Sequence, residues 1–386
     1  MSKGTLPEGW SLKRLDELAR VTSGKRLPKG RRLSTAQTDH PYIRVTDMFM
    51  GGVDTSGIQY VPDDVFPEIA QFTVAAGDIF ISCAGTLGLV GIVPESLHGA
   101  NLTENANRIW SIQCDRRFLL SVLMSDRIQS VIQNIQTVGA QPKLALGRIR
   151  SFEILCPDNL PEQQAIAAAL SDADGVVAGL ERVIAKKRLI KQGAMQDLLT
   201  ARRRLPGFSG EWAKVQLKDY TSHGSGNSGL IKGTLQRSGR VGDYPAFTAS
   251  GPDLMLDFFE QEGDAIIISA VGSRCGKAFR AKGKWSAIAN THVLRCREGL
   301  DVDFAFIFMN DEDFWLKGGT GQPFVLVRRT LERPLLLPPV NEQQAIASVL
   351  RDMGAEIQNL ESRLTKARAV KEGMMQNLLT GRVRLV

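Results

Sequence analysis

Residues 162–167 read Glu-Gln-Gln-Ala-Ile-Ala, and residues 342–347 repeat the same six letters. The offset of 180 residues holds without a gap to the end of the chain, and 22 of the 45 positions from 161 to 205 are identical to their counterparts. Chance cannot produce this agreement, and the period is far longer than that of solenoid repeats. The sequence therefore predicts a duplicated half-protein.

Both repeats carry the apolar seam of a coiled coil. Hydrophobic side chains step alternately by four and three residues, which is typical of helices that pair along one face. The seam is formed by Ile166, Leu170, Val177, Leu180, Ile184 and Leu198 in the first repeat, and by Ile346, Leu350, Ile357, Leu360, Leu364 and Leu378 in the second. Each helix is expected to run about 38 residues, or roughly 57 Å at 1.5 Å per residue.

Each long helix needs a partner for its seam, and the nearest partner is the other copy. A globular block between the two helices allows them to pair as an antiparallel coiled coil, with an internal pseudo-twofold. The alternative is that each helix packs onto its own domain as part of that domain's core. The expected division is 1–160, 161–205, 206–340 and 341–386, with a variable block before each helical repeat.

The two variable blocks are related to each other. Each opens on a tryptophan, Trp10 or Trp212, and each later has a Gly-Asp pair, beginning at Gly77 or Gly263, before an apolar run that reads as a buried strand. Between such anchors the blocks diverge. We expect two mixed α/β (α+β) heads that share one scaffold and carry two different surfaces.

Composition narrows the function classes. Of 386 residues, 43% are apolar and 23% charged, and the net charge of +7 with a pI near 9.2 favours a polyanionic partner or a solvated basic surface. The five cysteines form no Cys-x-x-Cys pair, so we expect neither disulfides nor a metal site, and a reducing cytoplasm. No apolar run approaches the roughly 18 residues of a membrane helix.

Catalytic signatures are missing from the sequence. The chain has no Asx-Pro-Pro-aromatic methyltransferase motif, and no Asp or Glu is followed two residues later by lysine, as in restriction-type nucleases. Residues 272–278 resemble a P-loop but are one residue short, and residues 224–229 fit a Gly-x-Gly-x-x-Gly pattern with a poor helix opening after it. We therefore expect a non-catalytic chain without a cofactor.

Several residues are candidates for DNA contact. A glycine- and proline-containing loop could neutralise phosphates, or could simply be a solvated basic loop, through Lys25, Arg26, Lys29, Arg31 and Arg32. Arg237 and Arg240 lie in a comparable place in the second block. Side chains that can bridge base edges are expected at Arg44, Thr46, Gln141, Lys143, Thr248, Ser250 and Gln322.

The ordered set of motifs resembles the specificity subunits of type I restriction enzymes over essentially the whole chain. The resemblance is carried by the Glu-Gln-Gln motifs at 162–164 and 342–344, by the helix ends that read Lys…Gly…Met-Gln-x-Leu-Leu-Thr, and by the two opening tryptophans. One departure is Cys-Pro-Asp-Asn-Leu-Pro at 156–161, where the second repeat has a double proline at 338–339.

This resemblance implies the following function. Each variable block would be a target recognition domain that reads one half of a split, asymmetric site in double-stranded DNA, and the coil would act as a ruler. Two modification subunits would methylate adenine, and two restriction subunits would join for cleavage. The alternatives are a targeting subunit of another phage-defence methylation system, a coiled-coil scaffold without DNA readout, and an enzyme fragment.

Overall fold

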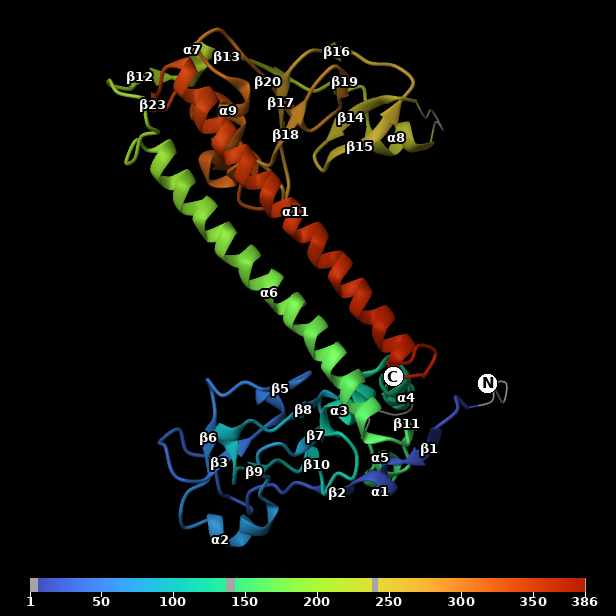
Figure 1. The fold of residues 1–386 in the computed structure, drawn as a ribbon. Helices are drawn as coiled ribbons and strands as arrows, with labels where there is room; N and C mark the ends of the chain where they lie inside the picture. Colours follow the sequence, from blue (N-terminus) through green and yellow to red (C-terminus); the bar gives the residue numbers. More distant parts are fainter. Residues whose placement is uncertain (1–5, 137–142, 238–241, 386) are drawn as a thin grey trace. The chain divides into compact units, whose positions relative to one another are not determined.

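The structure is a computed structural model that describes residues 6–136, 143–237 and 242–385 (Figure 1). The chain divides into two compact units. The first unit consists of residues 1–181 and 362–386, and the second of residues 182–361. Each unit therefore contains one head, the beginning of one long helix and the end of the other.

The two repeats form α6 (Leu160–Leu199) and α11 (Val340–Leu378), which confirms the expected long helices and the antiparallel coiled coil. The antiparallel direction follows from the ion pairs within each unit, because residue numbers rise along one helix of the pair as they fall along the other. These ion pairs are Asp174–Lys371 and Glu181–Arg368 in the first unit, and Arg188–Glu361 and Arg204–Glu342 in the second.

The seam residues are the buried or half-buried positions of both helices, while most positions between them are exposed. At the helix ends the seam also enters the heads. Ile166 and Leu170 belong to the hydrophobic core of the first head, and Ile346 and Leu350 belong to that of the second. The two expected packing modes thus occur together, since each helix begins as part of a head and continues as part of the coil.

The first head is built from short strands and helices around a four-stranded sheet in the order β2-β10-β7-β8. A three-stranded sheet has the order β6-β3-β9, and β4 pairs with β5. The strands are β1 (Trp10–Arg14), β2 (Arg20–Ser23), β3 (Pro41–Ile43), β4 (Met48–Phe49), β5 (Gly52–Val53), β6 (Gln59–Tyr60), β7 (Ile79–Ser82), β8 (Val90–Ile92), β9 (Asn101–Leu102), β10 (Ala106–Trp110) and β11 (Glu153–Pro157). The helices are α1 (Leu15–Leu18), α2 (Phe66–Ile69), α3 (Arg116–Met124), α4 (Asp126–Gln136) and α5 (Leu146–Arg150), with 3-10 turns at Val45–Asp47, Ala70–Phe72 and Glu95–Leu97.

The second head repeats this plan with a four-stranded sheet in the order β13-β20-β17-β18. A second sheet has the order β15-β14-β19-β16, and β21 pairs with β22. The strands are β12 (Ala213–Gln216), β13 (Thr221–Ser225), β14 (Tyr244–Thr248), β15 (Gly251–Leu256), β16 (Gln261–Glu262), β17 (Ala265–Ser269), β18 (Ala278–Ala281), β19 (Lys284–Ala287), β20 (Thr291–Cys296), β21 (Lys317–Gly318), β22 (Phe324–Val325) and β23 (Pro334–Leu337). The helices are α7 (Leu217–Tyr220), α8 (Lys232–Arg237), α9 (Val302–Met309) and α10 (Val327–Leu331), with a 3-10 turn at Glu312–Phe314.

In each head the opening strand pairs antiparallel with the strand that precedes a long helix: β1 with β11 in the first head, and β12 with β23 in the second. The opening tryptophans are therefore placed at the start of α6 and α11. The Gly-Asp pairs precede β7 and β17, both of which are buried along their whole length, as the sequence predicted. The P-loop-like residues form the turn between β17 and β18.

Candidate nucleic-acid interface

A polar joint fixes the first head to the helix that follows it. Glu162, in the first turn of α6, is fully buried. Its carboxylate accepts hydrogen bonds from Trp10 Nε1 at 3.3 Å, from Asn159 Nδ2 at 3.2 Å and from Arg384 Nη2 at 2.7 Å. The Arg384 guanidinium also donates to the carbonyl of Glu8. One carboxylate thus contacts β1, the segment before α6 and the segment that follows α11.

The second unit builds the same joint from the matching residues. Glu342, also fully buried, accepts from Trp212 Nε1 at 3.2 Å and from Arg204 Nη2 at 2.6 Å. Arg204 also donates to the carbonyl of Gly210 at 2.7 Å, and its guanidinium lies over the Trp212 ring. This geometry accounts for the glutamate of the repeated motif and for the arginine that recurs 42 residues after it.

Charge pairing governs the ionisation of the first joint. Burial on its own would raise the pKa of Glu162, but the hydrogen bond and the charge of Arg384, with hydrogen bonds from Asn159 and Trp10, outweigh it and hold that pKa below its usual value. The carboxylate is therefore ionised at neutral pH. A buried ion pair of this kind is costly to break from one side, because the remaining charge loses its partner.

The glutamine after each glutamate fixes a helix inside the head. Gln163 accepts from the Asp115 backbone N–H at 2.7 Å and donates to the Pro157 carbonyl at 2.8 Å. Gln343 accepts from the Asp301 N–H at 2.8 Å and donates to the carbonyls of Gly299 and Pro338 at 2.9 and 2.8 Å. Asp115 and Asp301 are the N-caps of α3 and α9, so one buried amide sets the start of a head helix in each unit.

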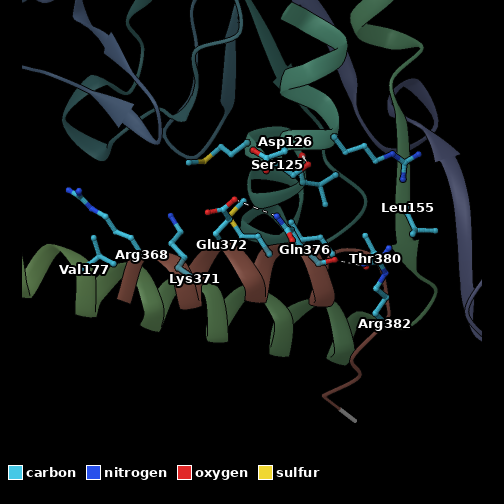
Figure 2. Close-up of a pocket in the computed structure, with 15 residues that line it drawn as sticks. Ser125, Asp126, Leu155, Val177, Arg368, Lys371, Glu372, Gln376, Thr380 and Arg382 are labelled. Atoms are coloured by element: carbon cyan, nitrogen blue, oxygen red, sulfur yellow. Dashed lines mark hydrogen bonds between the residues drawn. The ribbon is translucent and has the colours of Figure 1, made fainter. Parts of the chain in front are cut away.

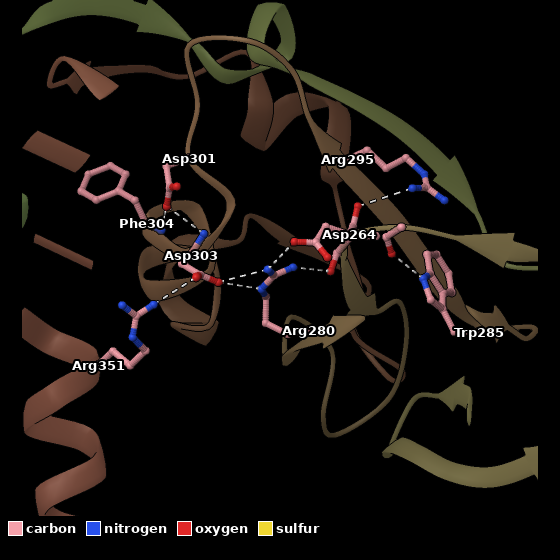
Figure 3. Close-up of polar contacts among 10 residues, drawn as sticks. Asp264, Arg280, Trp285, Arg295, Asp301, Asp303, Phe304 and Arg351 are labelled. Atoms are coloured by element: carbon pink, nitrogen blue, oxygen red, sulfur yellow. Dashed lines mark hydrogen bonds and ion pairs between the residues drawn. The ribbon is translucent and has the colours of Figure 1, made fainter. Parts of the chain in front are cut away.

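Further ion pairs join the second head to α11 (Figure 3). Arg280 on β18 lies between Asp264 and Asp303, with nitrogen–oxygen distances of 3.1 and 3.0 Å. Asp303, in the first turn of α9, also pairs with Arg351 of α11 at 3.2 Å. These contacts connect β18, α9 and α11.

The basic loop of the first head is exposed at each of its five cationic residues. Two cations have acidic neighbours: Arg26 lies 3.4 Å from Glu104, and Arg31 pairs with Asp64. Within the described chain, Lys25, Lys29 and Arg32 make no ion pair. Because Lys25 lies over the Phe72 ring at 5.5 Å, Lys29 and Arg32 are the cations most available to a phosphate.

The base-reading candidates differ in their accessibility. Arg44 is half-buried, and its guanidinium is bound to Asp47 and to the Gly57 carbonyl, so it is held by the head itself. Thr248 is buried, and its hydroxyl accepts the Ser250 N–H at 2.9 Å; we therefore assign it to a turn rather than to the surface. Thr46 and Ser250 are exposed.

A Gln-Pro loop was predicted near the end of each block. In the second head, Gln322 is exposed in the turn between β21 and β22, next to the turn between β17 and β18, since the Gly272 N–H donates to the Pro323 carbonyl at 2.9 Å. In the first head Lys143 is exposed. Three of the predicted DNA-contact residues are not described. Gln141 and Arg240 fall outside the described residues, and so does the side chain of Arg237.

The structure adds candidates that sequence reasoning missed. Arg274, in the turn beside Pro323, is exposed, and so are Arg328 and Arg329 on α10, which follows β22. The P-loop-like pattern at residues 272–278 is one residue short of that motif, as the sequence indicated. Its glycines serve a surface turn that carries an arginine, and Gly272 has a φ of +88°.

Among the described residues no three His, Cys, Asp or Glu side chains gather in a way that could hold a metal ion. No helix in that part of the chain is both long and apolar enough to cross a membrane.

Two unlike heads, each joined to the antiparallel helix pair by the same set of contacts, define a two-headed architecture. Comparison with known proteins shows which family the chain resembles. Residues 7–187 match the family model described as "Type I restriction modification DNA specificity domain". The match covers 181 of the 386 residues, and over that part the chain is similar to the specificity domains of type I restriction-modification systems.

Two relatives that are named as specificity subunits also match the chain. A Methanocaldococcus jannaschii protein named as the MjaX type I restriction enzyme specificity subunit is 23% identical over 99% of this chain and 95% of its own length. The MjaVIII specificity subunit of the same organism is 22% identical over 53% of this chain and 49% of its own length.

The fold is shared with solved specificity subunits. The type I S subunit of M. genitalium superposes with a TM-score of 0.59 at 17% identity, covering 98% of this chain and 97% of that one. The HsdS subunit of Thermoanaerobacter tengcongensis superposes with a TM-score of 0.54 at 17% identity, covering 99% of both chains. At these identities the structures establish the architecture, including the long helices.

Proposed function

We propose that each head reads one short DNA sequence, and that the two sequences are unlike and are separated by a fixed gap. The observation that carries the proposal is the repeated joint: the same Trp-Glu-Arg contacts fix both heads to the coil, while the surface loops differ between the heads. In this proposal residues 1–160 and 206–340 are the target recognition domains, and the helical repeats set the gap.

The chain is proposed to act through partner subunits in the cytoplasm. Two modification subunits would transfer methyl groups to adenine, and two restriction subunits would join them for cleavage of double-stranded DNA. The five free cysteines fit a reducing compartment. No cofactor is assigned to this chain, because the sequence carries no catalytic motif that would use one.

A methylation map tests this function. The chain is co-expressed with the modification subunit encoded beside it, in a host that lacks both, and N6-methyladenine is located by sequencing. We expect a split, asymmetric motif that is modified only when the chain is present. Methylation that is unchanged without the chain, or absent from an intact complex, would favour a coiled-coil scaffold instead.

Phosphate contacts are proposed for the basic loop of the first head. Each phosphate that a cation neutralises contributes about 0.9 to the slope of log affinity against log salt. Replacing Lys29 and Arg32 by alanine is therefore expected to weaken duplex binding and to lower that slope by up to about two. Lys366→Ala, an exposed change on α11, is the control for the loss of positive charge, and an equal effect from it would refute the loop assignment.

A further inference from the structure

Each unit has a groove along its helix pair. In the first unit the groove measures about 610 Å³ and lies between α11 and the link from α3 to α4 (Figure 2). Its helical wall is formed by Val177, Arg368, Lys371, Glu372, Met375 and Gln376. In the second unit a smaller groove of about 370 Å³ is lined by Arg188, Lys191, Gln192, Met195, Gly354, Ile357 and Gln358.

The two grooves are built from the same repeat positions. Arg188, Lys191, Met195 and Ile357 are the 180-residue counterparts of Arg368, Lys371, Met375 and Val177. One ion pair is also repeated across the two units, because Arg368 binds Glu181 in the first, and Arg188 binds Glu361 in the second. The first groove can therefore serve as a template for what the second groove accommodates.

The grooves differ at two acidic positions. In the first unit Asp174 forms an ion pair with Lys371, and Glu372 lies on the groove wall. The second unit has Gly354 in place of Asp174, and Gln192 in place of Glu372. The second groove has thus lost two carboxylates while keeping both cations.

The loss leaves one ammonium group unmatched. A Cβ atom built on Gly354 would lie 3.0 Å from Lys191 Nζ, so the ammonium occupies the space beside the missing side chain. Within the described part of the second unit, Lys191 makes no hydrogen bond or ion pair. It is half-buried on the seam, where an unmatched charge is more costly than on an open surface.

We propose that the groove around Lys191 is a docking site for a carboxylate side chain of a partner polypeptide. The ligand chemistry is read from the first unit, where the same lysine position binds the carboxylate of Asp174. A protein acid fits better than a DNA phosphate, because the internal ligand is a single carboxylate delivered from a helix. Gln192 and Gln358 supply neutral hydrogen-bonding groups at the rim of the groove.

The partner used in the test is the modification subunit encoded beside the chain, so the inference rests on the proposed function. Gly354→Asp supplies the missing carboxylate from within the chain. The change favours the helix, since glycine is the poorer helix former, and the atom that it approaches is the end of a flexible side chain. Gly175→Asp makes the same substitution at an exposed position of α6 with open space around it.

Affinity for the modification subunit is measured by calorimetry on the full-length chain and on each variant. We expect Gly354→Asp to weaken binding about tenfold, as for the loss of one charge-assisted contact, while Gly175→Asp binds like the unaltered chain. Lys191→Gln should show a similar loss, and the double variant should lose no more than either single variant. Circular dichroism of each variant confirms that the helices are intact.

The inference is overturned by unchanged affinity of Gly354→Asp for the modification subunit, or by an equal loss of that affinity in Gly175→Asp. If the subunit affinity of Gly354→Asp is unchanged while its duplex affinity falls, the groove is assigned to a phosphate instead. If the unaltered chain forms no complex at all, the proposed function fails, and the inference fails with it.

Discussion

Gln343 is the residue whose removal most directly tests how a head is held to its helix. Its side chain is fully buried and makes three hydrogen bonds, to the Asp301 N–H and to the carbonyls of Gly299 and Pro338. At about 1 kcal/mol for each hydrogen bond, Gln343→Ala should cost the second unit roughly 3 kcal/mol. The loss should be concentrated at the start of α9, because Asp301 is the N-cap of that helix.

Hydrogen exchange is the suitable assay, since a chain of two compact units need not unfold in one step. Amides of α9 should exchange faster by the factor that corresponds to this free energy, while amides of the first head should be unchanged. Gln344→Ala is the matched control, because Gln344 is the neighbouring glutamine and is exposed. Equal effects from the two variants, or a loss of stability below about 1 kcal/mol for Gln343→Ala, would refute the role assigned to Gln343.

Three further results are expected. Leu350→Ala, at a seam position 2% exposed, should cost about 2–5 kcal/mol in urea unfolding, whereas Leu189→Ala, at a position 69% exposed, should be within about 0.5 kcal/mol of the unaltered chain. The lowered pKa of Glu162 stabilises the fold at pH values above about 4.5, the pKa of the unfolded chain. Stability should therefore fall as the pH drops below 4.5, and Glu162→Gln should flatten this dependence of stability on pH. Burial, and then His223, lower the pKa of His292 to about 4, so a second loss of stability should occur between about pH 6.5 and pH 4. Because burial also lowers the pKa of His223, His292→Asn should reduce this loss.

The long helices could be predicted because their signal is local and periodic. A seam that steps by four and three residues fixes which face is buried, and the burial of Ile166, Leu170 and Ile346 matches it. The sequence could not show that the seam is shared between coil and head. That division depends on where the head cores end, and no periodicity in the helices marks this point.

The joints were beyond sequence reasoning for a different reason. Glu162 and Glu342 were noticed as parts of a repeated motif, but their partners are remote: Trp10 lies 152 positions away from Glu162, and Arg384 lies 222 positions away. A repeated residue indicates that the side chain makes a contact, but it does not identify the residue that is contacted. Spacing therefore identified the residues that matter and left their roles open.

The base-reading candidates show what residue type alone cannot predict. Arg44 and Thr248 have suitable chemistry for DNA, yet the structure uses both internally, on Asp47 and on the Ser250 N–H. Residue type alone cannot tell a side chain that faces a ligand from one that supports a turn. Exposed Lys29, Arg32 and Gln322 retain their candidacy because the fold leaves them accessible.

The repeated joint explains how two heads can diverge without losing the architecture. In both units the glutamate and the following glutamine contact the opening tryptophan, a head-helix N-cap and backbone carbonyls, and these groups are kept while the loops change. Because the contacts lie where β1 meets β11 and where β12 meets β23, loop substitutions elsewhere in a head leave them intact. If each head reads one half-site, as proposed, exchange of one head's loops should alter that half-site and leave both the other half-site and the gap unchanged.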